Sequence, residues 1–145
     1  MTRSTFPWAG VAALALAGSM PAQRLEDPGK LREAAEQLER EVKDFNNQFD
    51  RELDKGFYDE LGLKERLDRR SEKLKGEVDG FRGKVKSSND KKARKKLDRT
   101  IQLTHDIHLT MRERRFSENL EQRWKLVRFE LNRMADYFDL SPLGT

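Results

Sequence analysis

Residues 31–53 read LREAAEQLEREVKDFNNQFDREL, in which apolar residues recur at alternating steps of four and three. The recurring positions are Leu31, Ala35, Leu38, Val42, Phe45, Phe49 and, one turn further, Leu53. This spacing places them on one stripe of an α-helix and the charged residues on the opposite face. An Asp-Pro pair at 27–28 supplies a helix start, and a Lys-Gly pair at 55–56 supplies a stop. The segment therefore predicts a helix over residues 28–55.

Three further segments carry a similar apolar stripe. Their apolar positions are Leu63, Leu67, Leu74, Val78, Phe81 and Val85, then Ala93, Leu97, Ile101, Leu103, Ile107 and Met111, then Leu120, Trp124, Val127, Leu131, Met134 and Phe138. They predict helices over residues 62–86, 90–114 and 118–139, the last capped by Ser117. Short links between amphipathic helices make neighbours antiparallel. We therefore expect an all-α, antiparallel four-helix bundle of up-down-up-down order over residues 23–145.

Residues 1–22 have the composition of a secretory signal peptide. One basic residue, Arg3, precedes an apolar run that ends near Met20, and charged residues resume at Arg24. The run is shorter than the roughly 20 residues that a spanning helix needs, so we expect no transmembrane span in the mature chain. The candidate cleavage sites follow Ala17, Ser19 and Ala22. This leader predicts a periplasmic or secreted protein.

The residue types present argue against catalysis. The chain has no cysteine, which excludes disulfides, thiolate metal sites and thiol nucleophiles. Its serines lie in the leader, in turns, at caps or in the helix over 62–86, and no glycine-elbow sequence surrounds them. Charged residues make up 39% of the chain, yet the apolar residues keep a helical period, unlike those of a disordered chain. We predict a folded protein that is not an enzyme and holds no cofactor.

Two histidines, His105 and His108, lie three residues apart with Asp106 between them. On a helix this spacing lets two imidazoles share one face and supply two ligands to zinc or copper. The apolar stripe, however, places Thr104 in the buried arc, His108 near its edge and His105 nearer the surface. A structural polar layer is therefore the leading interpretation. A metal site of His105, Asp106 and His108 is the alternative.

Glycines and lysines mark a candidate interaction surface. Gly76, Gly80 and Gly83 lie opposite the apolar stripe of their helix. The leading interpretation is that they only lower helix propensity and let this helix fray first, and the alternative is a smooth outward groove for a partner. A dense basic run follows, and its central lysines are Lys91, Lys92, Lys95 and Lys96. Residues 84–145 hold 15 basic and 9 acidic side chains, against 14 and 17 in residues 24–83. The second half of the chain is thus the basic one.

The predicted topology places acidic residues at the same end of the bundle as these lysines. They are Glu26, Asp27, Glu33, Asp136 and Asp139. We expect them to neutralise much of the lysine charge, which favours a solvated face. Electrostatic docking to anionic lipid or nucleic acid is a further hypothesis, although we expect no nucleic-acid partner.

Within the last helix, the segment WKLVRFELNRMADY from Trp124 to Tyr137 resembles the closing helix of uncharacterised exported bacterial helical-bundle proteins. The resemblance implies no activity. We predict a non-enzymatic protein of the cell envelope, or a secreted one, that acts through protein contacts as an adaptor, a chaperone-like factor or a structural component. The alternative function is a metal-binding or metal-responsive envelope bundle that uses His105 and His108. Two helical hairpins that pair as a homodimer are an alternative arrangement of the same stripes.

Overall fold

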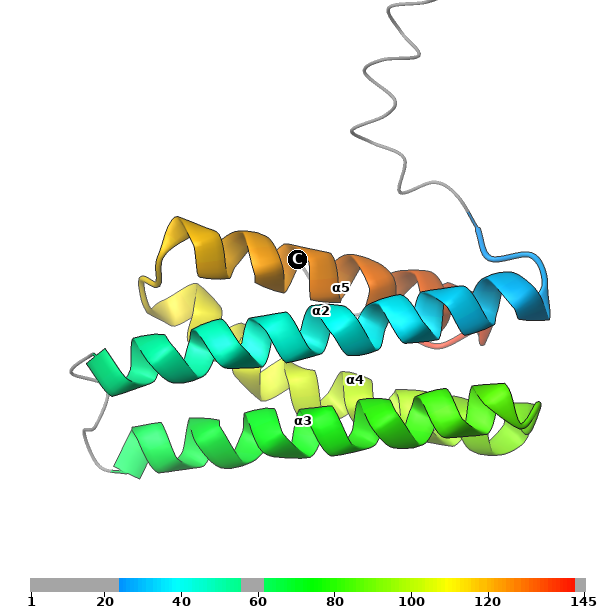
Figure 1. The fold of residues 1–145 in the computed structure, drawn as a ribbon, viewed down its shortest axis with the longest axis horizontal. Helices are drawn as coiled ribbons and strands as arrows, with labels where there is room; N and C mark the ends of the chain where they lie inside the picture. Colours follow the sequence, from blue (N-terminus) through cyan, green and yellow to red (C-terminus); the bar gives the residue numbers. More distant parts are fainter. Residues whose placement is uncertain (1–23, 56–61, 143–145) are drawn as a thin grey trace, which may run out of the picture.

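The computed structural model describes residues 24–55 and 62–142, which contain helices and no strand. The helices are α2 (Pro28–Lys55), α3 (Leu63–Lys86), α4 (Asp90–Glu113) and α5 (Glu118–Tyr137). They form a four-helix bundle in which α2 and α4 each contact both α3 and α5 (Figure 1). The predicted signal peptide, residues 1–22, and its candidate cleavage sites lie outside the described residues.

The core is built from the stripes that the sequence predicts. All seven stripe positions of α2 are buried, as are the six that run from Leu120 to Phe138. The stripes of α3 and α4 are less complete, because Leu63, Ile101 and Leu103 are only partly buried. On α4 two threonines, Thr100 and Thr104, are fully buried. The core side of α4 is therefore more polar than that of α2.

Aromatic side chains fill both ends of the core. The Phe45 ring lies 5.1 Å from that of Phe49 and 4.8 Å from the indole of Trp124, between ring centroids. At the other end, Phe81 meets Phe138 edge to face at 6.2 Å. Such pairs contribute roughly 0.5–1.5 kcal/mol beyond the area they bury. These contacts join α2 to α5 and α3 to the end of α5.

Side-chain caps begin three of the helices, two of them at Asp27 and Ser117 as the sequence predicts. The amides of Lys30, Lys92 and Leu120 donate to the side chains of Asp27, Asn89 and Ser117 over 2.8, 3.2 and 3.1 Å. The helix α3 lacks such a cap, and Gly62 precedes it with a φ of 72°. The helix α5 ends at Tyr137 rather than at residue 139, where Asp139 adopts a left-handed φ of 56°.

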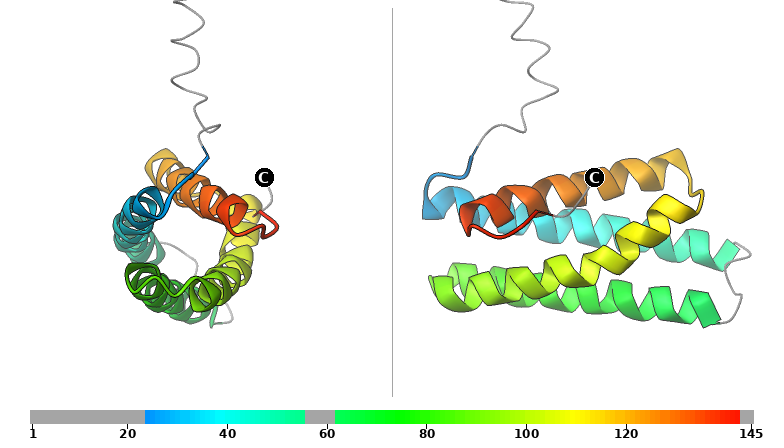
Figure 2. Two further views of the ribbon diagram at one scale, coloured as in Figure 1. Left: turned by 90° about the vertical axis from the view of Figure 1, so that its right-hand side faces the viewer. Right: turned by 180° about the vertical axis from the view of Figure 1, so that it is seen from behind.

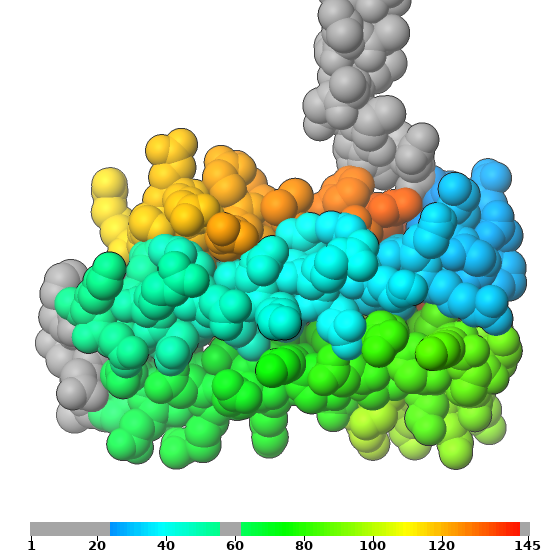
Figure 3. Space-filling model, viewed as in Figure 1, coloured from blue at the N-terminus to red at the C-terminus, as the bar shows by residue number. Residues whose placement is uncertain are grey.

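The helix α4 does not follow one neighbour along its whole length. Its first turns lie beside α3, and its last turns approach the start of α5 (Figure 2). The side chains of α2 and α3, by contrast, meet along the face that Figure 3 presents. None of the described helices combines the length and the apolar character that a membrane span requires.

Candidate functional site

The lysines at the start of α4 fall into two groups. Lys91, Lys92 and Lys95 are exposed, and their ammonium groups form no ion pair with a described residue. We call these three residues the lysine row. Lys96 differs, because its ammonium lies 3.5 Å from the carboxylate of Glu77 on α3 and the side chain is about 30% exposed. The cluster therefore presents three unpaired cations to solvent and holds the fourth against α3.

The acidic residues expected to neutralise this cluster have other roles. The carboxylate of Asp136 pairs with the guanidinium of Arg24 at 3.0 Å, and Asp27 caps α2. The remaining three, Glu26, Glu33 and Asp139, form no ion pair with the lysine row. None of the five acids therefore neutralises the lysine row through a direct ion pair. The unpaired charge of the row is a feature that the sequence alone did not establish.

The three glycines of α3 line the neighbouring surface, and we call them the glycine strip. Gly76 and Gly83 are exposed, and a Cβ atom added to either would meet nothing within 4 Å. At Gly80 the same atom would lie 3.4 Å from Cε of Lys96. The space above Gly76 and Gly83 is therefore open, whereas the stem of Lys96 covers Gly80.

The two halves of the bundle carry different charges. Together α3 and α4 hold 16 basic and 9 acidic side chains, whereas α2 and α5 hold 10 and 12. Because α3 and α4 contact each other, these charges gather on one half of the molecule. We call this half the basic hairpin. It attracts anionic groups over a distance of about one Debye length, roughly 8 Å at physiological salt.

The two histidines lie in different surroundings. His105 is exposed, whereas His108 is 5% exposed and its Nδ1 accepts a hydrogen bond from Nε1 of Trp124 at 3.1 Å. The carboxylate of Asp106 lies 3.4 Å from the guanidinium of Arg70 on α3. Among the described residues, no group of three His, Cys, Asp or Glu side chains is placed to hold a metal ion. The structure thus places His108 in a hydrogen bond with Trp124 of α5.

Threonines complete a polar layer on the core side of α4. The hydroxyl of Thr100 donates to the carbonyl of Lys96 at 2.8 Å, and that of Thr104 donates to the carbonyl of Ile101 at 2.7 Å. Both bonds stay within the helix, so burial leaves neither hydroxyl without an acceptor. This arrangement agrees with the structural interpretation of the segment around His108. The bond from His108 to Trp124 extends the layer to α5.

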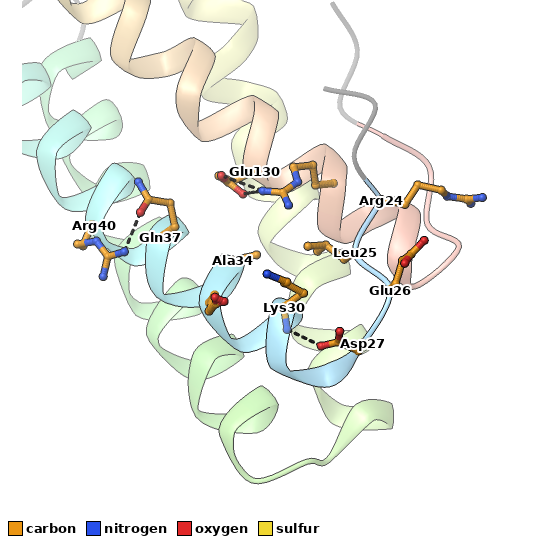
Figure 4. A pocket seen from close by; sticks show the side chains of 11 residues that line it. Arg24, Leu25, Glu26, Asp27, Lys30, Ala34, Gln37, Arg40 and Glu130 are labelled. Atoms are coloured by element: carbon orange, nitrogen blue, oxygen red, sulfur yellow. Dashed lines mark hydrogen bonds and ion pairs between the residues drawn. The ribbon is translucent and has the colours of Figure 1, made fainter. Parts of the chain in front are cut away.

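A cleft of about 870 Å³ lies between the first half of α2 and α5 (Figure 4). Its lining residues are Arg24, Leu25, Glu26, Asp27, Lys30, Glu33, Ala34, Gln37, Arg40, Glu130 and Arg133. Four of these are basic and four are acidic, so the cleft favours neither anions nor cations. The buried lining residues Leu25 and Ala34 belong to the core and offer little apolar surface to a ligand.

Glu130 is the buried charged group of this cleft. It is 7% exposed, and Nη1 of Arg133 donates to its two carboxylate oxygens at 2.9 and 3.3 Å. Burial raises the pKa of Glu130, and Arg133 opposes this rise. The Arg133 guanidinium also lies 5.4 Å from the centroid of the Phe129 ring. The charge of Glu130 is thus balanced by Arg133 on the same helix, and it needs no ligand in the cleft to balance it.

The burial of Glu130 was not predicted from the sequence, although a signal for its position was present. It follows Val127 by three residues and precedes Met134 by four, and both of these belong to the apolar stripe. Such spacing places a residue on the flank of the stripe, beside a neighbouring helix. A charged residue there indicates a buried ion pair when a partner lies one turn away, as Arg133 does.

The chain matches no protein-family model, no curated protein and no solved structure. Its class is therefore defined by its own structure, an all-helical four-helix bundle. The features that distinguish this bundle are a basic hairpin that carries the lysine row, a polar layer on α4 and a cleft between α2 and α5 whose acidic and basic lining residues are equal in number.

Proposed function

We propose that this chain is a non-enzymatic protein of the bacterial cell envelope, periplasmic or secreted, that acts by binding another protein. Its role is that of an adaptor, a chaperone-like factor or a structural component. The observation that carries the proposal is the lysine row, three exposed cations without ion pairs on the basic hairpin. Unpaired charge of one sign on one face steers encounter with a partner of the opposite sign.

The surface of the bundle supports a polar contact rather than an apolar one. Among the described residues the exposed large apolar side chains are Leu109, at 40%, and Leu126, at 49%, on different helices. Isolated apolar residues of this kind are normal on a soluble surface and make no docking patch. A partner therefore binds through charge and shape.

The topology and the export route belong to the same proposal. Lys64, at the start of α3, lies 2.7 Å from Asp54, at the end of α2. Arg82, near the end of α3, lies 3.0 Å from Glu39 in the first half of α2. These ion pairs support an antiparallel arrangement of α2 and α3, as the proposed up-down-up-down order requires. The sequence of residues 1–22 supports export by a cleaved signal peptide.

Site-specific photo-crosslinking in the native envelope tests the proposed function. A photoreactive residue replaces Lys95 of the lysine row in one strain and Lys43, an exposed lysine of α2, in another. We expect one discrete protein adduct from position 95, a weaker one or none from position 43, and a processed chain in the envelope or the medium. A chain that stays in the cytoplasm, or forms no adduct from any surface position, contradicts the proposal.

A further inference from the structure

We propose that the basic hairpin docks an acidic polypeptide segment of its partner across the outer face of α3 and α4. This inference rests on the function proposed above and specifies the partner's chemistry. The lysine row contacts the carboxylates of the segment, and the glycine strip gives its backbone room to approach. The supporting observations are the unpaired lysine charge, the open space over the glycine strip and the lack of large exposed apolar or aromatic side chains on the described part of this face.

Unpaired cations of α3 and α4 border the glycine strip on the side that faces α4. On α4, Lys92 precedes by one helical turn Lys96, whose ammonium lies beside Glu77 of α3, and the two lysines are neighbours on the helix surface. On α3, Lys73 and Lys84 flank the strip in sequence, and neither forms an ion pair with a described residue. A chain of carboxylates that follows the strip therefore meets lysines from two helices. An acidic polypeptide supplies such a chain of charges.

The strip itself is open to a partner. No atom lies within 4 Å of the positions that Cβ atoms would take at Gly76 and Gly83. At Gly80 the nearest atoms belong to the flexible end of Lys96, which can swing aside. The ion pair that holds this lysine to Glu77 is long, at 3.5 Å, and partly exposed. Partly exposed pairs of this kind contribute little to stability, so a carboxylate of the partner can replace Glu77.

The same face lacks the side chains that a bilayer or a nucleic acid uses. The exposed large apolar residues among those described are Leu109 and Leu126. Leu109 lies 18 residues beyond Lys91, about 27 Å along the helix at 1.5 Å per residue, and Leu126 lies on α5. No large apolar group on the described face is therefore placed to insert into lipid, and no exposed aromatic ring to stack on bases. These observations favour a protein segment.

The role of the lysine charge is tested with fluorescein-labelled poly-L-glutamate of 20 residues. Its binding is followed by fluorescence anisotropy at two salt concentrations. The triple variant K91E/K92E/K95E should bind at least tenfold more weakly than the native chain. The matched control K43E/R51E/K125E makes the same change in net charge at exposed positions of α2 and α5, and should bind within twofold of native. Equal losses in both variants would show an effect of net charge alone and would overturn the proposal.

Substitution of the glycines tests the shape of the surface. The variant G76Q/G83Q fills the strip without a change of charge and should weaken poly-L-glutamate binding at least fivefold. The control G76A/G83A adds only Cβ atoms into open space and should bind within twofold of native. Circular dichroism checks that both variants remain helical. Native-like binding by the glutamine variant overturns the docking geometry.

Three comparison measurements distinguish an acidic polypeptide from the other candidate ligands of this surface, which are lipid, nucleic acid and a second copy of the chain. Vesicles that contain phosphatidylglycerol and duplex DNA are titrated at equal concentrations of charge, and tighter binding of either probe overturns the proposal. Self-association that the lysine-row variant abolishes would make a second copy of this chain the occupant and would overturn it too. If the inference fails while photo-crosslinking still yields an adduct from α2 or α5, the proposed function survives with another surface.

Discussion

The indole Nε1 of Trp124 on α5 donates a hydrogen bond to Nδ1 of His108 on α4, over 3.1 Å in the interior of the bundle. A nitrogen that accepts this bond carries no proton, so the contact requires an imidazole that is unprotonated at Nδ1. The imidazole and the indole lie 6.3 Å apart between ring centroids. The Phe45 ring of α2 packs against the same indole at 4.8 Å. The bond ties α4 to α5 near their link.

A double-mutant cycle measures this bond. His108→Ala leaves the buried indole N–H without its acceptor and opens a cavity, so it should lower the free energy of unfolding by about 2–3 kcal/mol. Trp124→Phe removes the donor, and the double variant should be less destabilised than the sum of the two, with a coupling of about 1 kcal/mol. Urea denaturation of the four proteins gives these values.

The other histidine provides the control for this cycle. His105 lies on the same helix but is exposed, so His105→Ala should change the free energy of unfolding by less than about 0.5 kcal/mol. Additive effects of the His108 and Trp124 substitutions would mean that the hydrogen bond contributes nothing beyond packing. A large effect at His105 would contradict the burial pattern of α4.

The buried carboxyl of Glu130 should make the protein less stable as the pH rises. Burial raises its pKa above the ordinary value of 4.5, although Arg133 opposes the rise. The folded chain therefore holds this proton more tightly than the unfolded chain. The contribution of the Glu130 carboxyl to the free energy of unfolding is complete below pH 4.5 and is lost as the pH rises through the pKa of the folded state. The native chain should lose stability over this window relative to Glu130→Gln.

Urea denaturation at steps from acid to neutral pH gives the difference between native and Glu130→Gln chains. The difference is required because two other carboxyls act in the same direction. A hydrogen bond with Asp79, followed by burial, raises the pKa of Glu39, and burial together with Asp50 raises the pKa of Asp68. Parallel stability curves for the native chain and the variant would refute the assignment to Glu130.

Glu52 should show the opposite pH dependence. Its carboxylate accepts the backbone N–H of Ser117 at 2.9 Å and also the Ser117 hydroxyl, which connects α2 to the start of α5. Burial alone would raise its pKa, but the hydrogen bonds from Gln48 and Ser117 outweigh burial and lower it. This contribution is therefore present above the ordinary value of 4.5 and is lost as the pH falls through the folded pKa.

Glu52→Ala should accordingly destabilise the bundle by about 1 kcal/mol near neutral pH, as the loss of a capping contact does. The deficit should shrink in strong acid, where the native carboxylate is protonated as well. Glu36→Ala, at an exposed site of α2, is the matched control and should have little effect at any pH. A deficit that does not change with pH would locate the effect in packing instead of charge.

The parts of the fold that the sequence predicted depend on neighbours along the chain. The apolar steps of α2, the Asp27 cap and the Ser117 cap involve residues within one or two turns of each other. Such features follow from the helical period and from the donors that each helix start leaves unpaired. For this reason the stripes could be read from the sequence with few errors.

The candidate site needed the structure because its contacts join distant segments. Arg24 and Asp136 are 112 residues apart, and their ion pair removes one acid that was expected to face the lysines. The stem of Lys96 covers Gly80 because α4 begins beside α3, a packing detail that helix phase does not determine. The spacing of the apolar residues identifies the buried side of a helix. It does not identify which neighbouring helix packs against each flank of that side.

Glycine substitutions within α3 and at the residue before it should change stability in opposite directions. Gly76→Ala places a methyl group in open space within the helix and should raise the free energy of unfolding by about 1 kcal/mol. Gly62→Ala should lower it, because Gly62 has a φ of 72°, which strains an L-residue. Thermal melts measure both changes, and hydrogen exchange should be faster across residues 76–83 than in α2. Protection equal to that of α2 would show that the exposed glycines do not weaken α3.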